Sequence, residues 1–207
     1  MTIAALILAA GRASRFGSLK QLAPINNKPM LQHCIDSANS ALPGAVYTLL
    51  GYQSELIKPN ITATKIIEHP QWARGIGSSI SMGVNYLSSD FDAILIMLGD
   101  QPMIKSPYLT KLIDLFNRDQ DQIQKHQIQK HQTQKHQQTV CSRYQDNLGV
   151  PAIFSRRHFS DLMQLDGDQG AKQLLINLSP APKTLSLKGL FKDIDYPQDL
   201  NSVLYDE

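Results

Sequence analysis

Long apolar runs without alternation occur twice along the 207-residue chain, from Ile3 to Leu8 and from Ala93 to Leu98. A strand with one face in water alternates between apolar and polar side chains. A parallel strand covered on both faces instead reads as a continuous apolar run. We therefore predict buried parallel strands at Ile3 to Leu8 and at Asp92 to Leu98.

Other segments have the apolar spacing of helices. After Pro29, which suits a helix start, apolar residues recur at positions 31, 34, 35, 38 and 42 and predict one buried face. A loop and helix are predicted over 75–87, and Ser106 and Pro107 form an N-cap and first-turn pair for another helix. Shorter strands are predicted at 45–50 and 64–67. Strands alternating with helices predict a three-layer α/β/α domain with a mostly parallel, Rossmann-like sheet.

The segment 119–138 breaks this pattern, because it repeats a five-residue unit in the sequence DQDQIQKHQIQKHQTQKHQQ. It contains too little apolar surface to offset the entropy of ordering, so we predict an exposed loop or a frayed helix. Its histidines, His126, His131 and His136, would lie about 140° apart around a helix and are poor metal ligands. The prediction is a single domain over 1–207 with a low-complexity insertion at 119–138.

Composition and charge exclude several partners. The 20 basic and 18 acidic residues give a net charge of +2, so no overall field attracts nucleic acid or a membrane surface. No apolar stretch approaches the roughly 18 residues of a membrane span, and no cation precedes the first strand as in a secretory signal. Cys34 and Cys141 are predicted to be buried free thiols of a reducing compartment. The expected location is the cytoplasm.

The loop after the first strand, Gly11 to Lys20, is suited to bind an anion. Small residues at 9–11 allow the backbone to approach a ligand, while Arg15 supplies a forked cation and Lys20 a mobile one. The glycine spacing fits neither a Walker A loop nor a dinucleotide-binding fingerprint. The loop predicts a nucleoside triphosphate as ligand.

A second polar site, G-D-Q-P at 99–102, follows the other apolar run. Ligands of open α/β sheets bind at the carboxyl ends of the strands, so Asp100 is well placed to hold Mg²⁺, which takes oxygen ligands. The alternative interpretation is a polar turn in which Asp100 accepts a backbone hydrogen bond.

The spacing L-A-A-G-x-x-x-R-x-G-x-x-K over 8–20 resembles the signature of the nucleotidyltransferase superfamily with a glycosyltransferase-A-like fold. Together with G-D-Q-P, it resembles the molybdenum cofactor cytidylyltransferases. The segment 72–80 is similar to their base-binding loop; there Trp72 is expected to pack and Ser79 to start a helix. The resemblance implies catalysis by Arg15, Lys20 and Asp100. It also implies nucleotide binding by Leu8, Ala9, Ala10, Gly11, Arg15, Lys20, Gly77, Ser78, Ser79 and Gly99.

Residues 193–200, D-I-D-Y-P-Q-D-L, resemble a family segment in which the aspartate two residues before the proline provides a metal ligand. By this resemblance, Asp100 and Asp195 hold Mg²⁺ or Mn²⁺. Helix capping is the alternative for Asp195, and Asp199 is expected to serve the helix that begins at Pro197.

Two further segments resemble the acceptor side of the family's cleft. N-L-G-V-P-A-I-F at 147–154 resembles a glycine-x-proline entry into a strand, with Val150 where many relatives carry His or Asn. G-D-Q-G-A-K at 167–172 resembles a G-D-x-G-A-R segment that opens a helix, with lysine replacing arginine. The resemblance assigns Gly149, Pro151, Asp168 and Lys172 to the acceptor side, with helix capping as the alternative for Asp168.

The resemblance implies transfer of CMP from CTP to the phosphate of molybdopterin, with release of pyrophosphate. Guanylyltransferases of this group typically have L-A-G-G, so Ala10 favours CTP. The product would pass to a molybdoenzyme or its chaperone. One alternative is a guanylyltransferase or a sugar- or alditol-phosphate nucleotidyltransferase of the same superfamily. The other is a non-catalytic nucleotide-binding accessory protein for molybdoenzyme maturation.

Overall fold

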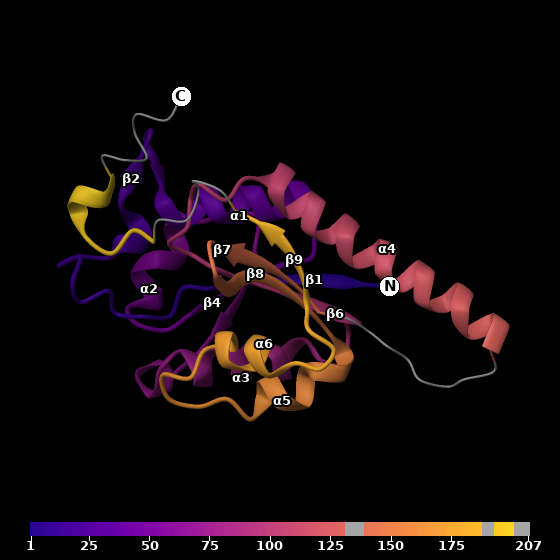
Figure 1. Ribbon diagram of the computed structural model, residues 1–207. Helices are drawn as coiled ribbons and strands as arrows, with labels where there is room; N and C mark the ends of the chain where they lie inside the picture. The colour runs from indigo at the N-terminus through magenta and orange to yellow at the C-terminus, as the bar shows by residue number, and fades with distance from the viewer. Residues whose placement is uncertain (131–138, 188–192, 201–207) are drawn as a thin grey trace.

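The computed structural model describes residues 1–130, 139–187 and 193–200 (Figure 1). Its centre is a seven-stranded sheet with the strand order β5-β4-β1-β6-β8-β7-β9. The strands are β1 (Ile3–Leu8), β4 (Val46–Leu50), β5 (Lys65–Glu68), β6 (Ala93–Leu98), β7 (Val140–Tyr144), β8 (Asn147–Ser155) and β9 (Lys183–Ser186). Strand β8 runs antiparallel to its neighbours β6 and β7, and the other pairs are parallel.

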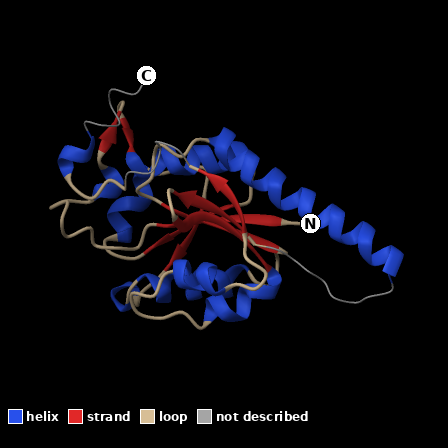
Figure 2. Ribbon diagram, viewed as in Figure 1, coloured by secondary structure: helices blue, strands red, loops and turns tan. Residues whose placement is uncertain are grey.

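Helices cover both faces of the sheet, as Figures 1 and 2 show. One face carries α1 (Met30–Ala41) and α4 (Ser106–Lys130), and the other carries α3 (Ile76–Leu87), α5 (Phe159–Met163) and α6 (Ala171–Asn177). The remaining elements are α2 (Ser54–Ile57), the hairpin β2 (Pro24–Ile25) and β3 (Lys28–Pro29), and the 3₁₀ turns η1 (Lys20–Leu22), η2 (Lys58–Asn60), η3 (Trp72–Arg74), η4 (Arg156–His158) and η5 (Pro197–Leu200). The predicted three-layer domain with a mostly parallel sheet is confirmed.

The central strands are apolar throughout because both of their faces are buried. In β1, Ala5 and Ile7 belong to the core beneath α1 and α4, whereas Ala4 and Leu6 belong to the core beneath α3. Strands β1 and β6 pair in register along their whole length, from Ile3 opposite Ala93 to Leu8 opposite Leu98. The residues that follow the two strands therefore emerge side by side at one edge of the sheet.

Most predicted elements are confirmed within a few residues, but two helix starts are wrong. Helix α3 begins at Ile76 rather than at Ser79, because Gly75 turns the chain with a φ of 102° that L side chains rarely adopt. Helix α6 begins at Ala171 with Gly170 at its N-cap, so Asp168 lies outside the helix and does not cap it. In α1, the helix begins one residue after Pro29.

Helix α4 continues through the first part of the repeat tract, up to Lys130. Figure 1 shows this end of α4 extending away from the sheet. His131 and His136 lie outside the described residues, and the single-domain boundaries remain a prediction. Among the described helices, none is long and apolar enough to cross a bilayer.

The two cysteines, Cys34 in α1 and Cys141 in β7, are buried and free, as predicted. Burial raises the pKa of Cys34 to about 12 and that of Cys141 to about 11. Both side chains are therefore neutral thiols that pack as small apolar groups.

Deletion of residues 120–137 is expected to shift the melting temperature by less than about 3 °C, which corresponds to under about 1 kcal/mol. The buried α4 residues from Leu109 to Phe116 would remain, and surface insertions contribute little to closure entropy. The matched control is Phe116→Ala, which removes a fully buried ring from the same helix and should cost roughly 3–5 kcal/mol. Thermal unfolding followed by circular dichroism measures both variants. A deletion as damaging as Phe116→Ala would contradict the prediction.

Candidate active site

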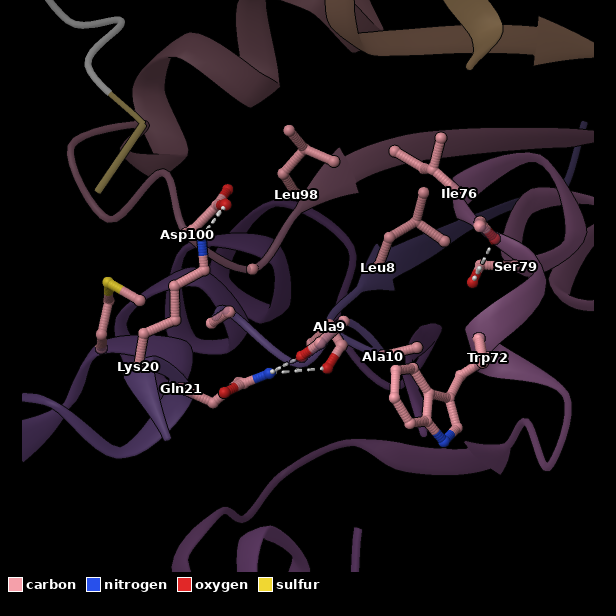
Figure 3. A pocket seen from close by; sticks show the side chains of 16 residues that line it. Leu8, Ala9, Ala10, Lys20, Gln21, Trp72, Ile76, Ser79, Leu98 and Asp100 are labelled. Carbon is pink, nitrogen blue, oxygen red and sulfur yellow. Dashed lines mark hydrogen bonds and ion pairs between the residues drawn. The ribbon is translucent and has the colours of Figure 1, made fainter. Parts of the chain in front are cut away.

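A cavity of about 380 Å³ opens where β1 and β6 end (Figure 3). Its walls come from the loop after β1, the start of η1, the turn from η3 into α3, and the end of β6. This is the edge at which open α/β sheets bind their ligands. Among the predicted site residues, the lining contains Leu8, Ala9, Ala10, Gly11, Lys20, Ser79, Gly99 and Asp100.

The backbone beneath the cavity is held by Gln21, which the sequence analysis did not identify. Its Nε2 donates hydrogen bonds to the carbonyl oxygens of Ala9 at 3.1 Å and Gly11 at 3.0 Å, and the residue is only 4% exposed (Figure 3). Leaving a buried carbonyl without a donor costs about 1–3 kcal/mol, so Gln21 fixes the course of the loop. A glutamine that bonds backbone carbonyl groups belongs to no recognisable motif, so the sequence alone could not identify Gln21.

Two predicted catalytic residues, Lys20 and Asp100, form an ion pair at the end of the cavity. Lys20 Nζ lies 2.7 Å from Asp100 Oδ2 and 3.4 Å from Asp195 Oδ1. The same ammonium donates to the carbonyl oxygen of Ile194 at 3.2 Å. The structure thus brings together three residues that are far apart in the sequence, Lys20, Asp100 and Asp195.

Electrostatics keeps Lys20 charged. Burial alone would lower the pKa of Lys20, but the charges of Asp100 and Asp195, together with their hydrogen bonds, more than offset burial and raise this pKa above its ordinary value. The ammonium of Lys20 therefore lies as a cation between the side chains of Asp100 and Asp195.

The carboxylate of Asp100 has an oxygen available for a metal. Among the described residues, buried Asp100 Oδ1 has no hydrogen-bond partner. A metal ion is one partner that would satisfy such an atom, and Mg²⁺ and Mn²⁺ favour carboxylate oxygens. Within the ranges that the structure describes, no group of three or more His, Cys, Asp or Glu side chains is arranged to hold a metal. Phosphate oxygens and water would therefore complete the shell around Asp100 and Asp195.

The segment 193–200, called here the C-terminal strap, reaches the site through a small hydrophobic cluster. Ile194 is fully buried there with Phe16, Ala23, Ile25 and Met30. The backbone N–H of Ile194 also donates to the carbonyl oxygen of Asp100 at 3.2 Å. These contacts fix the position of the neighbouring Asp195.

Within the strap, Asp199 acts at the start of η5, as expected. Its Oδ2 accepts hydrogen bonds from the backbone N–H groups of Asp195 at 3.1 Å and Tyr196 at 2.9 Å. Asp195 itself points to Lys20 and Arg15 rather than capping the turn.

Arg15 lies at the rim of the site. Its Nη1 is 3.4 Å from Asp195 Oδ2, and its side chain is 68% exposed. Within the described residues it is not part of the cavity lining. Arg15 is therefore next to the cluster but outside the cavity, and its phosphate-binding role remains a prediction.

The predicted base-binding loop forms the opposite wall. Trp72 packs edge-on against Tyr52, with ring centroids 5.2 Å apart, and also lines the cavity. The hydroxyls of Ser78 and Ser79 both donate to the carbonyl oxygen of Gly75, at 2.9 and 3.4 Å. Of the two, only Ser79 lines the cavity.

The structure gives other partners to Gly77 and Ser78. A Cβ on Gly77 would lie 2.6 Å from the carbonyl oxygen of Asp166, so this glycine permits close packing between the first turn of α3 and the loop that contains Asp166. Ser78 Oγ lies 3.0 Å from Nε2 of buried His69. These contacts explain both residues without a nucleotide, whose binding by them remains a prediction.

Small residues let the ends of β1 and β6 approach each other. A Cβ on Gly99 would lie 2.8 Å from Leu31 Cδ1 and 3.0 Å from Ala9 Cβ. Ala10 belongs instead to the core beneath α3 and has Trp72 as a neighbour in the cavity wall. The packing therefore favours glycine at position 99.

A second cavity, of about 340 Å³, adjoins the first and shares Leu8, Ile76 and Leu98 with it. Gly149 and Lys172, which were assigned to the acceptor, line this cavity. The other two, Pro151 and Asp168, are not among the lining residues of the described chain. Lys172 Nζ donates to Asn147 Oδ1 at 3.0 Å at the same wall.

Gln101 and Asp193, neither of which the sequence analysis assigned to the site, also line the second cavity. Gln101 Nε2 donates to Asp193 Oδ1 at 2.7 Å. Burial and the charges of Asp100 and Asp195 raise the pKa of Asp193, although the hydrogen bond from Gln101 partly offsets them. The signal in the sequence was their position beside two predicted metal ligands, Asp100 and Asp195.

Solved structures share this fold over nearly the whole chain. The chain is 25% identical to Rv0371c from Mycobacterium tuberculosis H37Rv, with a TM-score of 0.80 over 100% of this chain and 98% of that one. A manganese complex of Rv0371C from the same strain has a TM-score of 0.74 at 23% identity, covering 99% of this chain and 98% of that one. CMP:2-keto-3-deoxy-manno-octonic acid synthetase complexed with CTP has a TM-score of 0.70 at 16% identity, covering 99% and 97% of the two chains.

Among curated proteins, the bifunctional protein GlmU of Pseudomonas aeruginosa (strain LESB58) is 32% identical over 125 residues. The aligned part covers 58% of this chain but only 27% of GlmU. The family model described as the MobA-like NTP transferase domain matches residues 5–181, and the chain therefore belongs to this family.

Proposed function

We propose that this protein transfers CMP from CTP to the phosphate of molybdopterin, with release of pyrophosphate. The observation that carries the proposal is the cluster of Lys20, Asp100 and Asp195, of which Lys20 and Asp100 line the first cavity. Their sequence neighbours Gln101 and Asp193 line the adjoining second cavity. A transferase of this kind must hold a polyanionic donor, a metal and an acceptor at one point. Membership of the MobA-like NTP transferase family supports nucleotidyl transfer in general.

The first cavity suits the nucleoside triphosphate. The loop after β1, braced by Gln21, directs its backbone toward the phosphates, while Lys20 and Arg15 neutralise their charge. The base lies toward Trp72 and Ser79 at the opposite wall. The CTP complex of the structurally similar CMP:2-keto-3-deoxy-manno-octonic acid synthetase supports a cytidine nucleotide in this fold.

Asp100 and Asp195 would hold the divalent cation, Mg²⁺ or Mn²⁺. When bound there, the cation supplies charge stabilisation to the α-phosphate and its leaving group. The manganese complex of the similar protein Rv0371C supports a divalent metal in this fold. The unpartnered Oδ1 of Asp100 supports the same assignment.

The second cavity suits the acceptor. A phosphate oxygen of the acceptor attacks the α-phosphorus in line and forms a new P–O bond. The bond between the α-phosphorus and the oxygen that bridges to the β-phosphate breaks, and pyrophosphate leaves. The residues that line the two cavities position donor and acceptor, and a covalent enzyme intermediate is unnecessary. Lys172 and Gly149 are the acceptor-side residues that line this cavity.

The second candidate is a sugar-phosphate nucleotidyltransferase of the same superfamily. The similarity to CMP:2-keto-3-deoxy-manno-octonic acid synthetase favours a sugar-derived acceptor in general, because the name of that protein includes a sugar acid as well as CTP. Molybdopterin as acceptor rests on the G-D-Q-P resemblance and on the MobA-like family assignment.

Pyrophosphate release tests the proposal directly. Purified protein with Mg²⁺ is incubated with each of the four nucleoside triphosphates, with molybdopterin, a hexose 1-phosphate or no acceptor. Release that requires both CTP and molybdopterin is expected. Release that requires the sugar phosphate would favour the second candidate. Binding of nucleotide without release in any combination would refute the enzyme and favour the accessory protein.

Asp100→Asn is expected to lower kcat by at least about 100-fold, because it removes one charged metal ligand from the reacting centre. The matched control is Asp36→Asn, which breaks an equally short Lys–Asp pair of 2.7 Å, between Lys28 and Asp36, away from the cavity. Steady-state kinetics of pyrophosphate release measures both variants, and circular dichroism checks their folding. Near-wild-type turnover in a folded Asp100→Asn protein would contradict the metal role.

Ala10→Gly is expected to raise kcat/KM for GTP relative to CTP by about tenfold, since one methyl group in a pocket is worth about 1–3 kcal/mol of discrimination. Ala10 is 5% exposed and lines the cavity beside Trp72, so its methyl group limits the space at that wall. Steady-state kinetics measures kcat/KM for GTP and for CTP with the same preparation, so that each nucleotide serves as the control for the other. An unchanged ratio would show that base choice depends on other residues.

A further inference from the structure

The ammonium of Lys20 is surrounded by three oxygen atoms. It donates to Asp100 Oδ2 at 2.7 Å, to the carbonyl oxygen of Ile194 at 3.2 Å and to Asp195 Oδ1 at 3.4 Å. A lysine ammonium has three N–H donors, so these partners use all of them. We call Asp100 Oδ2, Asp195 Oδ1 and the Ile194 carbonyl oxygen the oxygen cage.

The oxygen cage is also a set of ligands for a hard divalent cation. Two carboxylate oxygens and one backbone carbonyl oxygen are the types of ligand that Mg²⁺ and Mn²⁺ take. The side chain of Lys20 is only 14% exposed, so its charge is poorly screened by water at this position. A divalent cation held by Asp195 and by either oxygen of Asp100, the cage oxygen Oδ2 or the unpartnered Oδ1, would lie close to the ammonium. The two cations therefore repel each other and compete for the cage.

We propose that Lys20 occupies the cation position in the free protein, so that the divalent metal binds tightly only when a triphosphate draws the lysine out. This inference rests on the proposed function, because it assigns the metal to Asp100 and Asp195. It adds an order to substrate binding: nucleotide and metal enter together, and the free protein holds the metal weakly.

The chain is suited to this exchange. Lys20 starts η1, and the adjacent Gln21 fixes the backbone through its bonds to Ala9 and Gly11, so only the lysine side chain has to move. A lysine has a flexible four-carbon stem and can turn from the carboxylates to nearby phosphate oxygens. In the absence of both metal and nucleotide, the ammonium also offsets the repulsion between Asp100 and Asp195.

The test is titration of the free protein with Mn²⁺, followed by electron paramagnetic resonance of the unbound ion. Wild-type protein is expected to bind Mn²⁺ weakly, and at least about tenfold more tightly with a non-hydrolysable CTP analogue. Lys20→Met is expected to bind Mn²⁺ at least about tenfold more tightly than wild type without nucleotide, because a competing charge in direct contact is gone. Lys20→Gln, which is also neutral, serves as a second variant if Lys20→Met does not fold.

Two variants locate the effect. Lys28→Met removes the lysine of an exposed pair of equal length, Lys28 with Asp36 at 2.7 Å, and should leave Mn²⁺ affinity at the wild-type value. Adding Asp100→Asn to Lys20→Met should abolish the gain. Mn²⁺ affinity of a folded Lys20 variant no higher than that of wild type would overturn the inference.

The same preparation separates this inference from the proposed function. Wild-type protein that releases pyrophosphate, with no gain of Mn²⁺ affinity in the Lys20 variants, overturns only the inference. Wild-type protein that releases no pyrophosphate with any nucleotide overturns the proposed function. In that case, a gain of Mn²⁺ affinity in Lys20→Met that is lost on adding Asp100→Asn still supports the oxygen cage as a cation site.

Discussion

Burial of β1 and β6 on both faces constrains where this protein can place polar groups. Each of these strands consists only of apolar residues, since α1 and α4 cover one side and α3 covers the other. Charged side chains therefore begin where the strands end. Because the strands pair in register, the loop after Leu8 and the residues after Leu98 share one edge, and Lys20 meets Asp100 there.

Packing also brings the C-terminal strap to this edge. Ile194 is buried in the cluster with Phe16 and Met30, so the loop that contains Lys20 and the strap that contains Asp195 share one small core. Charge alone would favour separation of Asp100 and Asp195. The apolar cluster holds Asp195 near Asp100, and the ammonium of Lys20 balances their charges. Hydrophobic burial thus assembles an acidic site from segments far apart in the sequence.

The sequence was sufficient to predict the layers, the parallel strands and the loop residues at the strand ends, because burial and strand ends leave direct patterns. It was insufficient for interactions that depend on tertiary partners. Gln21 is identifiable only from the two carbonyl groups that it binds. Gly77 lies in a segment that resembles the family, but the close approach of Asp166 explains why this position is a glycine. Asp168 had a suitable residue type for an N-cap, but the chain enters α6 two residues later, at Gly170.

We propose that the end of β6 and the C-terminal strap form one divalent-metal site beside a triphosphate cavity. The most direct measurement is anomalous X-ray diffraction from crystals grown with Mn²⁺ and a non-hydrolysable CTP analogue. We predict a manganese peak between the carboxylates of Asp100 and Asp195, in contact with the phosphates, and Lys20 turned from the carboxylates to the phosphates. A peak elsewhere, or a nucleotide whose phosphates lie away from Gly11 and Lys20, would contradict it.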